Sequence, residues 1–340
     1  MQLPQIDFSA RKDLHTVIAG GRTVYQGHPT TVQAPDGTIF CVWTIRHGGS
    51  CGPLAKSADG GRSWETVPTP ENWREHVNCP TIWNLDGKLF VYAQEPESRI
   101  MVYSISEDGG SVWTPMRRCG GNIVSVMPWT TILTDRRGRF VAMTNTRDPE
   151  NRDRDCNRIV RSYSTDGMNW SAPEAVTHLP EAKLCEPWLI PSPDGSVWAC
   201  LMRANNRRYS SMVMFSENCG ETWSSPRELP RHLKGDRHIA RYLPDGRILA
   251  VFRNEDADSP EYGHFCGWIG RWQDLTAGTP GEMTVKLLHH CTDSGISNGD
   301  CGYPGLEILP DGGVLATTYI RYHKEDGGNS VVCLRLPSEF

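Results

Sequence analysis

Residues 185–203, CEPWLIPSPDGSVWACLMR, decide the predicted fold. Two short apolar runs flank the Pro-Asp-Gly turn at 193–195. An Asp-Gly pair between apolar runs is a strong hairpin signal, because glycine supplies the positive φ of a tight turn. The two ends of a hairpin finish side by side. We therefore expect Glu186, which opens the first strand, to lie beside Arg203, which ends the second.

The same hairpin pattern occurs six times, starting near residues 28, 79, 127, 186, 238 and 303. Successive copies begin about 50 to 65 residues apart, a period typical of repeat architectures. One such unit cannot bury its faces alone, whereas several units closed in a ring hide their edges. The repeats predict one all-β domain, residues 1–340, in which roughly residues 15–24 supply the strand that closes the last unit.

Composition agrees with this fold and argues against two classes of partner. The 12 tryptophans, 33 glycines and 24 prolines favour many short strands over long helices. The net charge is −5 and the chain has no long basic block, so we expect no nucleic-acid partner. No stretch of eighteen apolar residues occurs, so we expect no membrane insertion.

Cysteine usage and the N-terminus bear on the compartment. The 12 cysteines are scattered with no C-x-x-C pair, and several lie inside apolar runs, which favours reduced thiols. The first residues contain no apolar signal segment. We therefore expect a cytoplasmic protein, or a secreted one if a signal peptide has been removed.

A second repeat lies between the hairpins. Four segments begin with serine, have Asp or Asn two residues later, and end in glycine and tryptophan: SADGGRSW (57–64), SEDGGSVW (106–113), STDGMNW (164–170) and SENCGETW (216–223). The pattern indicates a β-turn whose acidic or amide side chain accepts from backbone amides, with the tryptophan ring buried between neighbouring units. We interpret these segments as structural.

These segments resemble Asp-boxes, also called bacterial neuraminidase (BNR) repeats, of the sialidase-like superfamily. Four of them in register with six hairpins cover nearly the whole chain. The resemblance implies a six-bladed β-propeller, in which each blade is a four-stranded antiparallel sheet whose first strand lines the axis. It also implies a glycoside hydrolase acting on a carbohydrate.

In such a ring the strand openings and the second-strand ends meet on one face. The openings are His28, Cys79, Met127, Glu186, His238 and Tyr303. The second strands end near Arg46, Glu95, Arg147, Arg203, Arg253 and Arg321, with Tyr319 close to the last of these. Five arginines around one opening suggest an anionic ligand, because the guanidinium fork pairs bidentately with carboxylates.

Individual residues resemble the sialidase site. Glu186 and Arg203 are similar to the family's glutamate and the arginine that follows it in the carboxylate-binding triad, and Arg237 is a candidate for a further member. Tyr303 resembles the tyrosine nucleophile, which glutamate activates. A phenol has a pKa of roughly 10, so an adjacent base is needed near neutral pH.

Two positions depart from the sialidase pattern. His28 stands where the family has an arginine, and the loop HGGSCGPLAK (47–56) has no aspartate to serve as acid. His47 and Asp300 are the candidate acids, while Asp236 and Glu95 are further carboxylates near the axis. The charge run RDPENRDRD (147–155), which contains Asp148 and Glu150, reads as a solvated loop.

Several functions remain open. The first is a sialidase-like exo-glycosidase for an acidic or otherwise polar sugar. The second is a propeller lyase that removes a proton beside a uronate carboxylate, and the third is a non-catalytic carbohydrate-binding propeller. A metal held by His28, His238 and a carboxylate lacks any metal-spaced motif, so we expect no metal and no cofactor. The sequence leaves oligomerisation open.

Overall fold

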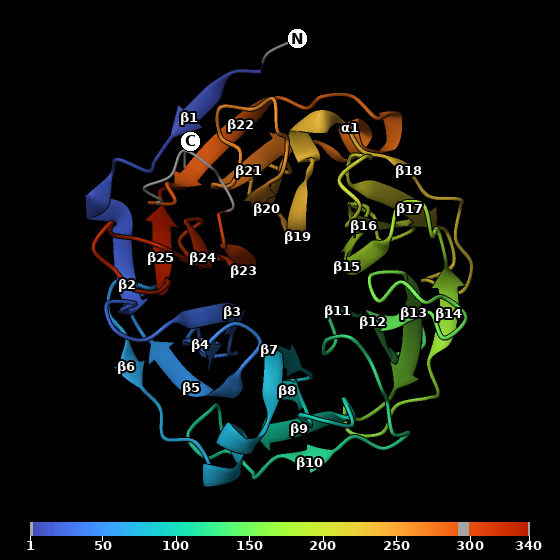
Figure 1. The fold of residues 1–340 in the computed structure, drawn as a ribbon, viewed down its shortest axis with the longest axis horizontal. Helices are drawn as coiled ribbons and strands as arrows, with labels where there is room; N and C mark the ends of the chain where they lie inside the picture. The colour runs from blue at the N-terminus through green and yellow to red at the C-terminus, as the bar shows by residue number, and fades with distance from the viewer. Residues whose placement is uncertain (1–2, 292–298, 339–340) are drawn as a thin grey trace.

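The computed structural model describes residues 3–291 and 299–338 as β-sheets arranged in a ring around a central axis (Figure 1). The fold is an all-β propeller, and hydrogen bonding divides its described strands into five sheets. The helical segments in this part of the chain are short: η1 (Lys12–Leu14), η2 (Glu71–Glu75), η3 (Arg231–Leu233) and α1 (Trp272–Ala277). No helix found there is long and apolar enough to cross a membrane.

The first two hairpin repeats share one eight-stranded sheet. Its strands are β3 (Gln26–Gln33), β4 (Ile39–Ile45), β5 (Ser50–Ser57), β6 (Glu65–Thr66), β7 (Val77–Leu85), β8 (Lys88–Gln94), β9 (Met101–Ser106) and β10 (Arg117–Arg118). The runs β3–β6 and β7–β10 are joined by a single residue pair, Ser50 with Val77. A sheet for each hairpin was expected. The described strands form five sheets and not six, because the start of β5 pairs with the start of β7 and joins two repeats into one sheet.

The third and fourth repeats form separate four-stranded antiparallel sheets. One contains β11 (Thr131–Thr134), β12 (Phe140–Arg147), β13 (Asn157–Ser164) and β14 (Glu174–Thr177). The other contains β15 (Leu184–Pro191), β16 (Trp198–Ala204), β17 (Met212–Ser216) and β18 (Arg227–Glu228). Cys185 pairs with Arg203 across β15 and β16, so the hairpin has the register that places Glu186 next to the end of β16.

The last two sheets incorporate the N-terminal strands. One contains β19 (Gly235–Tyr242), β20 (Ile248–Asn254), β21 (Phe265–Gly270) and β22 (Met283–Leu288), with β1 (Gln5–Asp7) parallel to β22. The other contains β23 (Gly302–Ile308), β24 (Val314–Ile320), β25 (Ser330–Leu336) and β2 (His15–Ala19), which runs antiparallel to β25. The beginning and end of the chain therefore share a sheet, which closes the ring (Figure 1).

Buried apolar side chains fill the spaces between neighbouring sheets. One cluster joins β15–β17, β19–β22 and β23–β25, and includes Trp188, Ile239 and Leu306. All twelve cysteines are unpaired, and all but Cys291 are buried. Most of the cysteines thus pack as small apolar groups in the core.

The four serine-to-tryptophan segments have one bonding pattern. In the first, Ser57 Oγ donates to Asp59 Oδ1 at 2.8 Å and accepts from the Gly61 amide at 2.8 Å. Trp64 Nε1 donates to the Gly61 carbonyl at 3.2 Å. The same three contacts recur in the segments that end at Trp113, Trp170 and Trp223. Each segment thus ties its serine, acidic or amide residue, glycine and tryptophan together.

These turns also connect neighbouring repeats. The ring of Trp113 packs edge-on against Phe40 of the preceding repeat, with 6.3 Å between ring centroids. Similarly, Tyr92 Oη donates to the Gly167 carbonyl of the following repeat at 2.6 Å. A turn that is local in sequence therefore helps to hold two repeats together.

The glycine pair in the second turn provides a stability test. Gly109 and Gly110 both have positive φ, 75° and 91°, but a Cβ at Gly109 meets open space, whereas one at Gly110 overlaps the Phe40 ring. We expect Gly109→Ala to cost about 1–2 kcal/mol for the left-handed backbone. Gly110→Ala should cost about 1–3 kcal/mol more because of overpacking. Urea unfolding of both variants measures the difference, and equal losses would contradict the packing role of Gly110.

Candidate active site

Five of the inner strands begin with the same backbone distortion. A non-glycine residue with positive φ stands at a register shift between the first and second strands of each hairpin. These residues are His28 (50°), Cys79 (40°), Glu186 (54°), Arg237 (52°) and Tyr303 (48°). Positive φ is uncommon for such residues, and bulges redirect side chains. The distortion brings residues of separate sheets into contact near the axis.

The fifth opening residue is Arg237, so the prediction that His238 holds this position is wrong. The register shift in β19 falls between Asp236 and Ile239, with Arg237 in the left-handed conformation. The His238 ring is fully buried against Phe252, and its Nε2 lies 2.8 Å from the Leu233 carbonyl. In the other openings the first residue is followed by proline, whereas in GDRH the residue after Arg237 is histidine. Without the proline as a marker, the sequence comparison of the repeats placed this opening one residue too late.

Glu186 and Tyr303 form the central contact of the site. Tyr303 Oη donates to Glu186 Oε1 at 2.6 Å, although 117 residues separate them in the chain. Arg203 Nη1 lies 3.2 Å from the same oxygen, as expected from the hairpin. The Glu186 amide donates to Asn145 Oδ1 at 3.2 Å. Burial, together with the Glu186 charge, raises the pKa of Tyr303 well above its ordinary value. Tyr303 is therefore a neutral phenol whose proton is directed at a carboxylate.

A buried carboxylate joins three arginines beside this pair. Asp236 pairs with Arg203 Nε at 2.8 Å, with Arg207 Nη2 at 2.9 Å, and with Arg253. Arg253 Nε also lies 2.7 Å from Glu255 Oε1. Burial opposes ionisation of Asp236, but the charges of Arg203 and Arg253 outweigh it and lower the pKa of Asp236. Arg203 and Arg253 are thus already paired with carboxylates, which weakens their predicted role in binding an anion.

Arg237 differs from these arginines in having no carboxylate partner in the described part of the chain. The residue is only 2% exposed. Its guanidinium lies 5.5 Å from the centre of the Tyr303 ring, and Nη1 lies 3.5 Å from Met127 Sδ. Burying a cation without an anion is unfavourable. Arg237 is therefore the cation in this site best suited to an incoming negative or strongly polar group.

Two histidines continue the site from Tyr303 towards the surface. The His28 ring packs edge-on against Tyr303 and against His47, with centroid distances of 4.6 Å and 4.5 Å. Burial, and next the neighbouring His47, lower the pKa of His28 to about 3. His28 is therefore neutral near pH 7 and cannot replace the charge of an arginine. His47 is exposed.

Asp300 lies beside His47 and accepts several hydrogen bonds. Tyr25 Oη donates to it at 2.6 Å and Tyr319 Oη at 2.8 Å, while His47 Nδ1 lies 3.6 Å away. Asn329 Nδ2 donates to the Asp300 carbonyl at 2.6 Å. Burial opposes ionisation of Asp300, but hydrogen bonds from His47, Tyr25 and Tyr319 lower its pKa. Asp300 is thus an ionised carboxylate that can orient His47 at the surface.

The remaining predicted residues stay outside these contacts. Arg46 and Arg147 are exposed, and their side chains have no partner among the described residues. Arg321 donates to the Lys324 carbonyl at 3.0 Å. Glu95 forms an ion pair with Arg118 at 2.6 Å. The expected convergence of five arginines is therefore reduced to Arg203 and Arg253. The prediction that Asp148 is solvated is also wrong, since the residue is only 6% exposed.

Sequence reasoning missed three residues of the site: Tyr25, Arg207 and Glu255. Tyr25 stands three residues before His28, and Glu255 stands two residues after Arg253. Their nearness to predicted site residues was a usable signal. The sequence did not reveal their partners: Arg207, for example, lies in the loop between β16 and β17, whereas Asp236 lies on β19 of another sheet.

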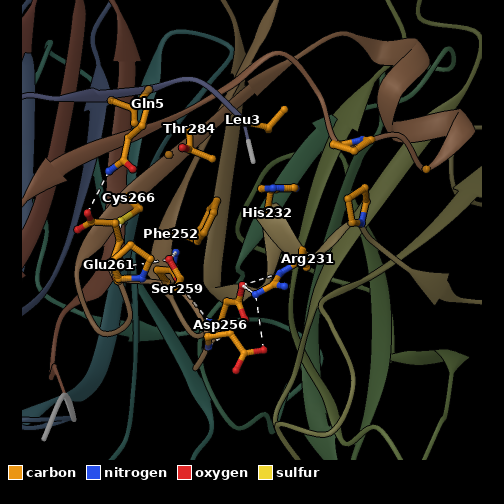
Figure 2. Close-up of a pocket in the computed structure, with 18 residues that line it drawn as sticks. Leu3, Gln5, Arg231, His232, Phe252, Asp256, Ser259, Glu261, Cys266 and Thr284 are labelled. Atoms are coloured by element: carbon orange, nitrogen blue, oxygen red, sulfur yellow. Dashed lines mark hydrogen bonds and ion pairs between the residues drawn. The ribbon is translucent and has the colours of Figure 1, made fainter. Parts of the chain in front are cut away.

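A separate cavity of about 680 Å³ lies away from this site. Figure 2 shows it between η3, β20, β21, β22 and the N-terminal segment, with Arg231, Phe252, Cys266 and Thr284 among its walls. Neither Glu186 nor Tyr303 lines this cavity. The volume of this cavity therefore does not describe the space around Glu186 and Tyr303.

Neither a family model nor a curated protein matches this sequence. Among solved structures, a protein of unknown function from Dyadobacter fermentans is similar over 95% of this chain and 98% of its own, with 17% identity and a TM-score of 0.72. An α-L-arabinanase from Penicillium chrysogenum, complexed with arabinobiose, is similar over 94% of this chain and 98% of its own, with 14% identity and a TM-score of 0.61.

A third similar structure is the NanB sialidase from Streptococcus pneumoniae, studied as its K499G mutant. It is similar over 95% of this chain and 70% of its own, with 10% identity and a TM-score of 0.64. At these identities the comparisons show the fold. This chain has the propeller fold found in sialidases and arabinanases.

The Asp236 network predicts a large effect on stability. Asp236→Asn removes the charge but keeps the shape, and leaves Arg203, Arg207 and Arg253 without their shared anion. We expect a loss of about 3–5 kcal/mol in the free energy of unfolding, as for other broken buried ion pairs. Asp245→Asn, the control, removes a half-exposed partner of one arginine and should cost less than about 1 kcal/mol. Denaturant unfolding measures both.

The same network predicts how stability changes with pH. The folded pKa of Asp236 lies below its ordinary value of 3.8, so its contribution is present above that value and is lost as the pH falls. Stability should therefore decline below about pH 4 in the wild type and less steeply in Asp236→Asn. Parallel pH profiles for the two proteins would contradict the assignment.

Proposed function

We propose that this chain is a sialidase-like glycoside hydrolase in which Tyr303 is the nucleophile and Glu186 its base. The observation that carries the proposal is the 2.6 Å hydrogen bond from Tyr303 Oη to Glu186 Oε1 inside a buried, arginine-supported site. The two runs of the eight-stranded sheet, β3–β6 and β7–β10, count in this proposal as two blades. The propeller then has six blades with Asp-boxes in four of them.

Tyr303 has the geometry of an activated nucleophile. Its raised pKa keeps the phenol neutral until a proton acceptor removes the proton, and Glu186 is within reach to do so. In the first step Tyr303 Oη bonds to the anomeric carbon as Glu186 takes its proton and the leaving-group oxygen departs. Water then releases the sugar from Tyr303, so the anomeric configuration is retained. Arg203 pairs with Glu186 and holds its carboxylate in place.

We propose His47 as the group that protonates the leaving group. It is exposed at the end of the contact series that runs from Tyr303 through the His28 ring. Asp300 lies 3.6 Å from its Nδ1 and can orient the ring. This pairing supplies an acid in a loop that has no carboxylate of its own.

The charges in the site favour a substrate with one acidic or strongly polar group. Arg237 is the buried cation without a carboxylate partner in the described residues, while Arg203 is shared between Glu186 and Asp236. Three converging arginines bind the carboxylate in the sialidase family, and here the first position holds neutral His28. We therefore expect aryl sialosides to be poor substrates.

The structural comparisons support carbohydrate as the substrate class. Solved structures of similar fold are named as sialidases, an α-L-arabinanase and an α-L-arabinofuranosidase. These are glycoside hydrolases with chemically different sugars. The likeness therefore favours the reaction type more than it favours any one sugar.

The Tyr303–Glu186 pair can be tested with variants of similar shape. Using a panel of aryl glycosides that includes sialosides, arabinofuranosides and uronides, we expect Tyr303→Phe and Glu186→Gln each to lower kcat by at least about 10²-fold on the best substrate. Tyr163→Phe is the control, because Tyr163 lies on β13 away from the axis. Normal turnover by Tyr303→Phe would rule out the nucleophile. An unsaturated product absorbing in the near ultraviolet would indicate the lyase instead.

A second test concerns Arg237. A charge-assisted hydrogen bond is worth about 1.5–3 kcal/mol, so Arg237→Gln should raise KM or Ki for an acidic sugar by roughly tenfold to more than a hundredfold. Arg237→Lys should recover little, because lysine lacks the planar fork. Arg147→Gln, which alters an exposed arginine, is the control. If Arg237→Gln leaves the discrimination between an acidic sugar and its methyl ester unchanged, Arg237 does not bind the acid.

A further inference from the structure

Three side chains of different types that can bind metals converge at one end of the β11–β14 sheet, away from Tyr303. They are Asp148 and Cys156, at the two ends of the loop between β12 and β13, and His178, which follows β14 directly. Their ligand atoms lie within 4.8 Å of one another. Asp148 and Cys156 are buried, while the His178 side chain is 31% exposed.

The distances fit tetrahedral coordination. His178 Nε2 lies 3.5 Å from Cys156 Sγ and 3.1 Å from Asp148 Oδ2. Zinc bonds of about 2.3 Å to sulfur and about 2.0 Å to nitrogen or oxygen, at tetrahedral angles, would separate sulfur from nitrogen by about 3.5 Å and nitrogen from oxygen by about 3.3 Å. Both distances from His178 Nε2 therefore lie within a few tenths of an ångström of such an arrangement, and the distance between the sulfur and the carboxylate oxygen is at most 4.8 Å.

A protein-only explanation satisfies these atoms less well. Both contacts use the same ring nitrogen of His178, and one nitrogen carries either one hydrogen or one lone pair. A catalytic relay of the Cys-His-Asp type needs two different ring nitrogens, so this arrangement is not such a relay. A single cation at the centre would instead engage the sulfur, the nitrogen and the oxygen together.

The surroundings also suit a bound dication. Arg158 Nη2 lies 2.7 Å from Asp148 Oδ1, the other oxygen of the carboxylate, and so fixes its orientation while leaving Oδ2 available. The charge of Arg158 is shared with Glu150 at 3.1 Å. A bound dication and Arg158 would carry three positive charges. A Cys156 thiolate and the carboxylates of Asp148 and Glu150 would carry three negative charges, so the net charge of this group would be zero.

We propose that Asp148, Cys156 and His178 form a zinc site. Sulfur and nitrogen donors favour zinc over magnesium or calcium, which prefer oxygen alone. The exposed side of His178 leaves room for water as the fourth ligand. The bound ion would fasten the 148–156 loop to the segment that leaves β14. Because β12 also carries Asn145, which accepts from the Glu186 amide, this loop begins close to the candidate active site.

The test uses the full-length protein after treatment with a chelator. Isothermal titration with Zn²⁺ should show one site per chain, and Co²⁺ should give a thiolate-to-metal charge-transfer band in the near ultraviolet. Cys156→Ser should abolish that band, and both Cys156→Ser and His178→Asn should weaken Zn²⁺ binding by more than the roughly 10–100-fold typical of outer-shell changes. Zn²⁺ should raise the Tm of the wild type and not of these variants.

Two matched variants control for nonspecific thiol or imidazole binding. Cys291→Ser alters a partly exposed cysteine elsewhere, and His76→Asn alters a histidine before β7. Both should bind Zn²⁺ like the wild type. The proposal is overturned if the wild type shows no saturable one-to-one binding, or if Cys156→Ser and His178→Asn bind as tightly as the two controls. Because the readout is metal binding, the result is independent of glycosidase activity.

Discussion

The candidate site depends on one backbone constraint, the left-handed residue at the opening of five inner strands. Each of these residues sits at a register shift, where the first strand departs from regular pairing with the second. Such conformations are unfavourable for non-glycine residues and persist where the surrounding structure enforces them. Here the pairing with the second strand and the closure of the ring hold these residues in the left-handed conformation. The same local distortion, repeated around the axis, gathers His28, Glu186, Arg237 and Tyr303.

Charge pairing then determines which of these groups is available to a ligand. Asp236 is the common partner of Arg203, Arg207 and Arg253, so most positive charge near Glu186 is neutralised within the protein. This arrangement holds the Glu186 carboxylate rigidly against Tyr303 and leaves Arg237 as the buried cation without a carboxylate partner in the described chain. The candidate site is consequently organised around the hydrogen-bonded pair Tyr303 and Glu186 and one buried cation, and not around a cluster of unpaired arginines.

Rigidity of the ring matters because the site is assembled from several sheets. Glu186 comes from β15, Arg237 from β19, Tyr303 from β23 and His28 from β3. The serine-to-tryptophan turns connect neighbouring repeats through contacts such as Trp113 with Phe40, and β2 with β25 closes the ring. A shift between two sheets would lengthen the 2.6 Å bond between Tyr303 and Glu186. Structural residues on the outer strands therefore support the geometry of the candidate site at the axis.

The sequence by itself determined the features that depend on neighbouring residues. The Asp-Gly turns and alternating apolar runs define the hairpins, and hairpin geometry places Arg203 beside Glu186, because both interactions are local. The tertiary structure decided the rest. Tyr303 meets Glu186 across 117 residues only when the ring closes. A bulge in β19 places Arg237, and not His238, at the opening of the strand, and no proline marks this bulge in the sequence. Asp148 is buried because His178 and Arg158, which are distant in the sequence, pack against it. Contacts between sheets are set by ring geometry, which no single segment encodes.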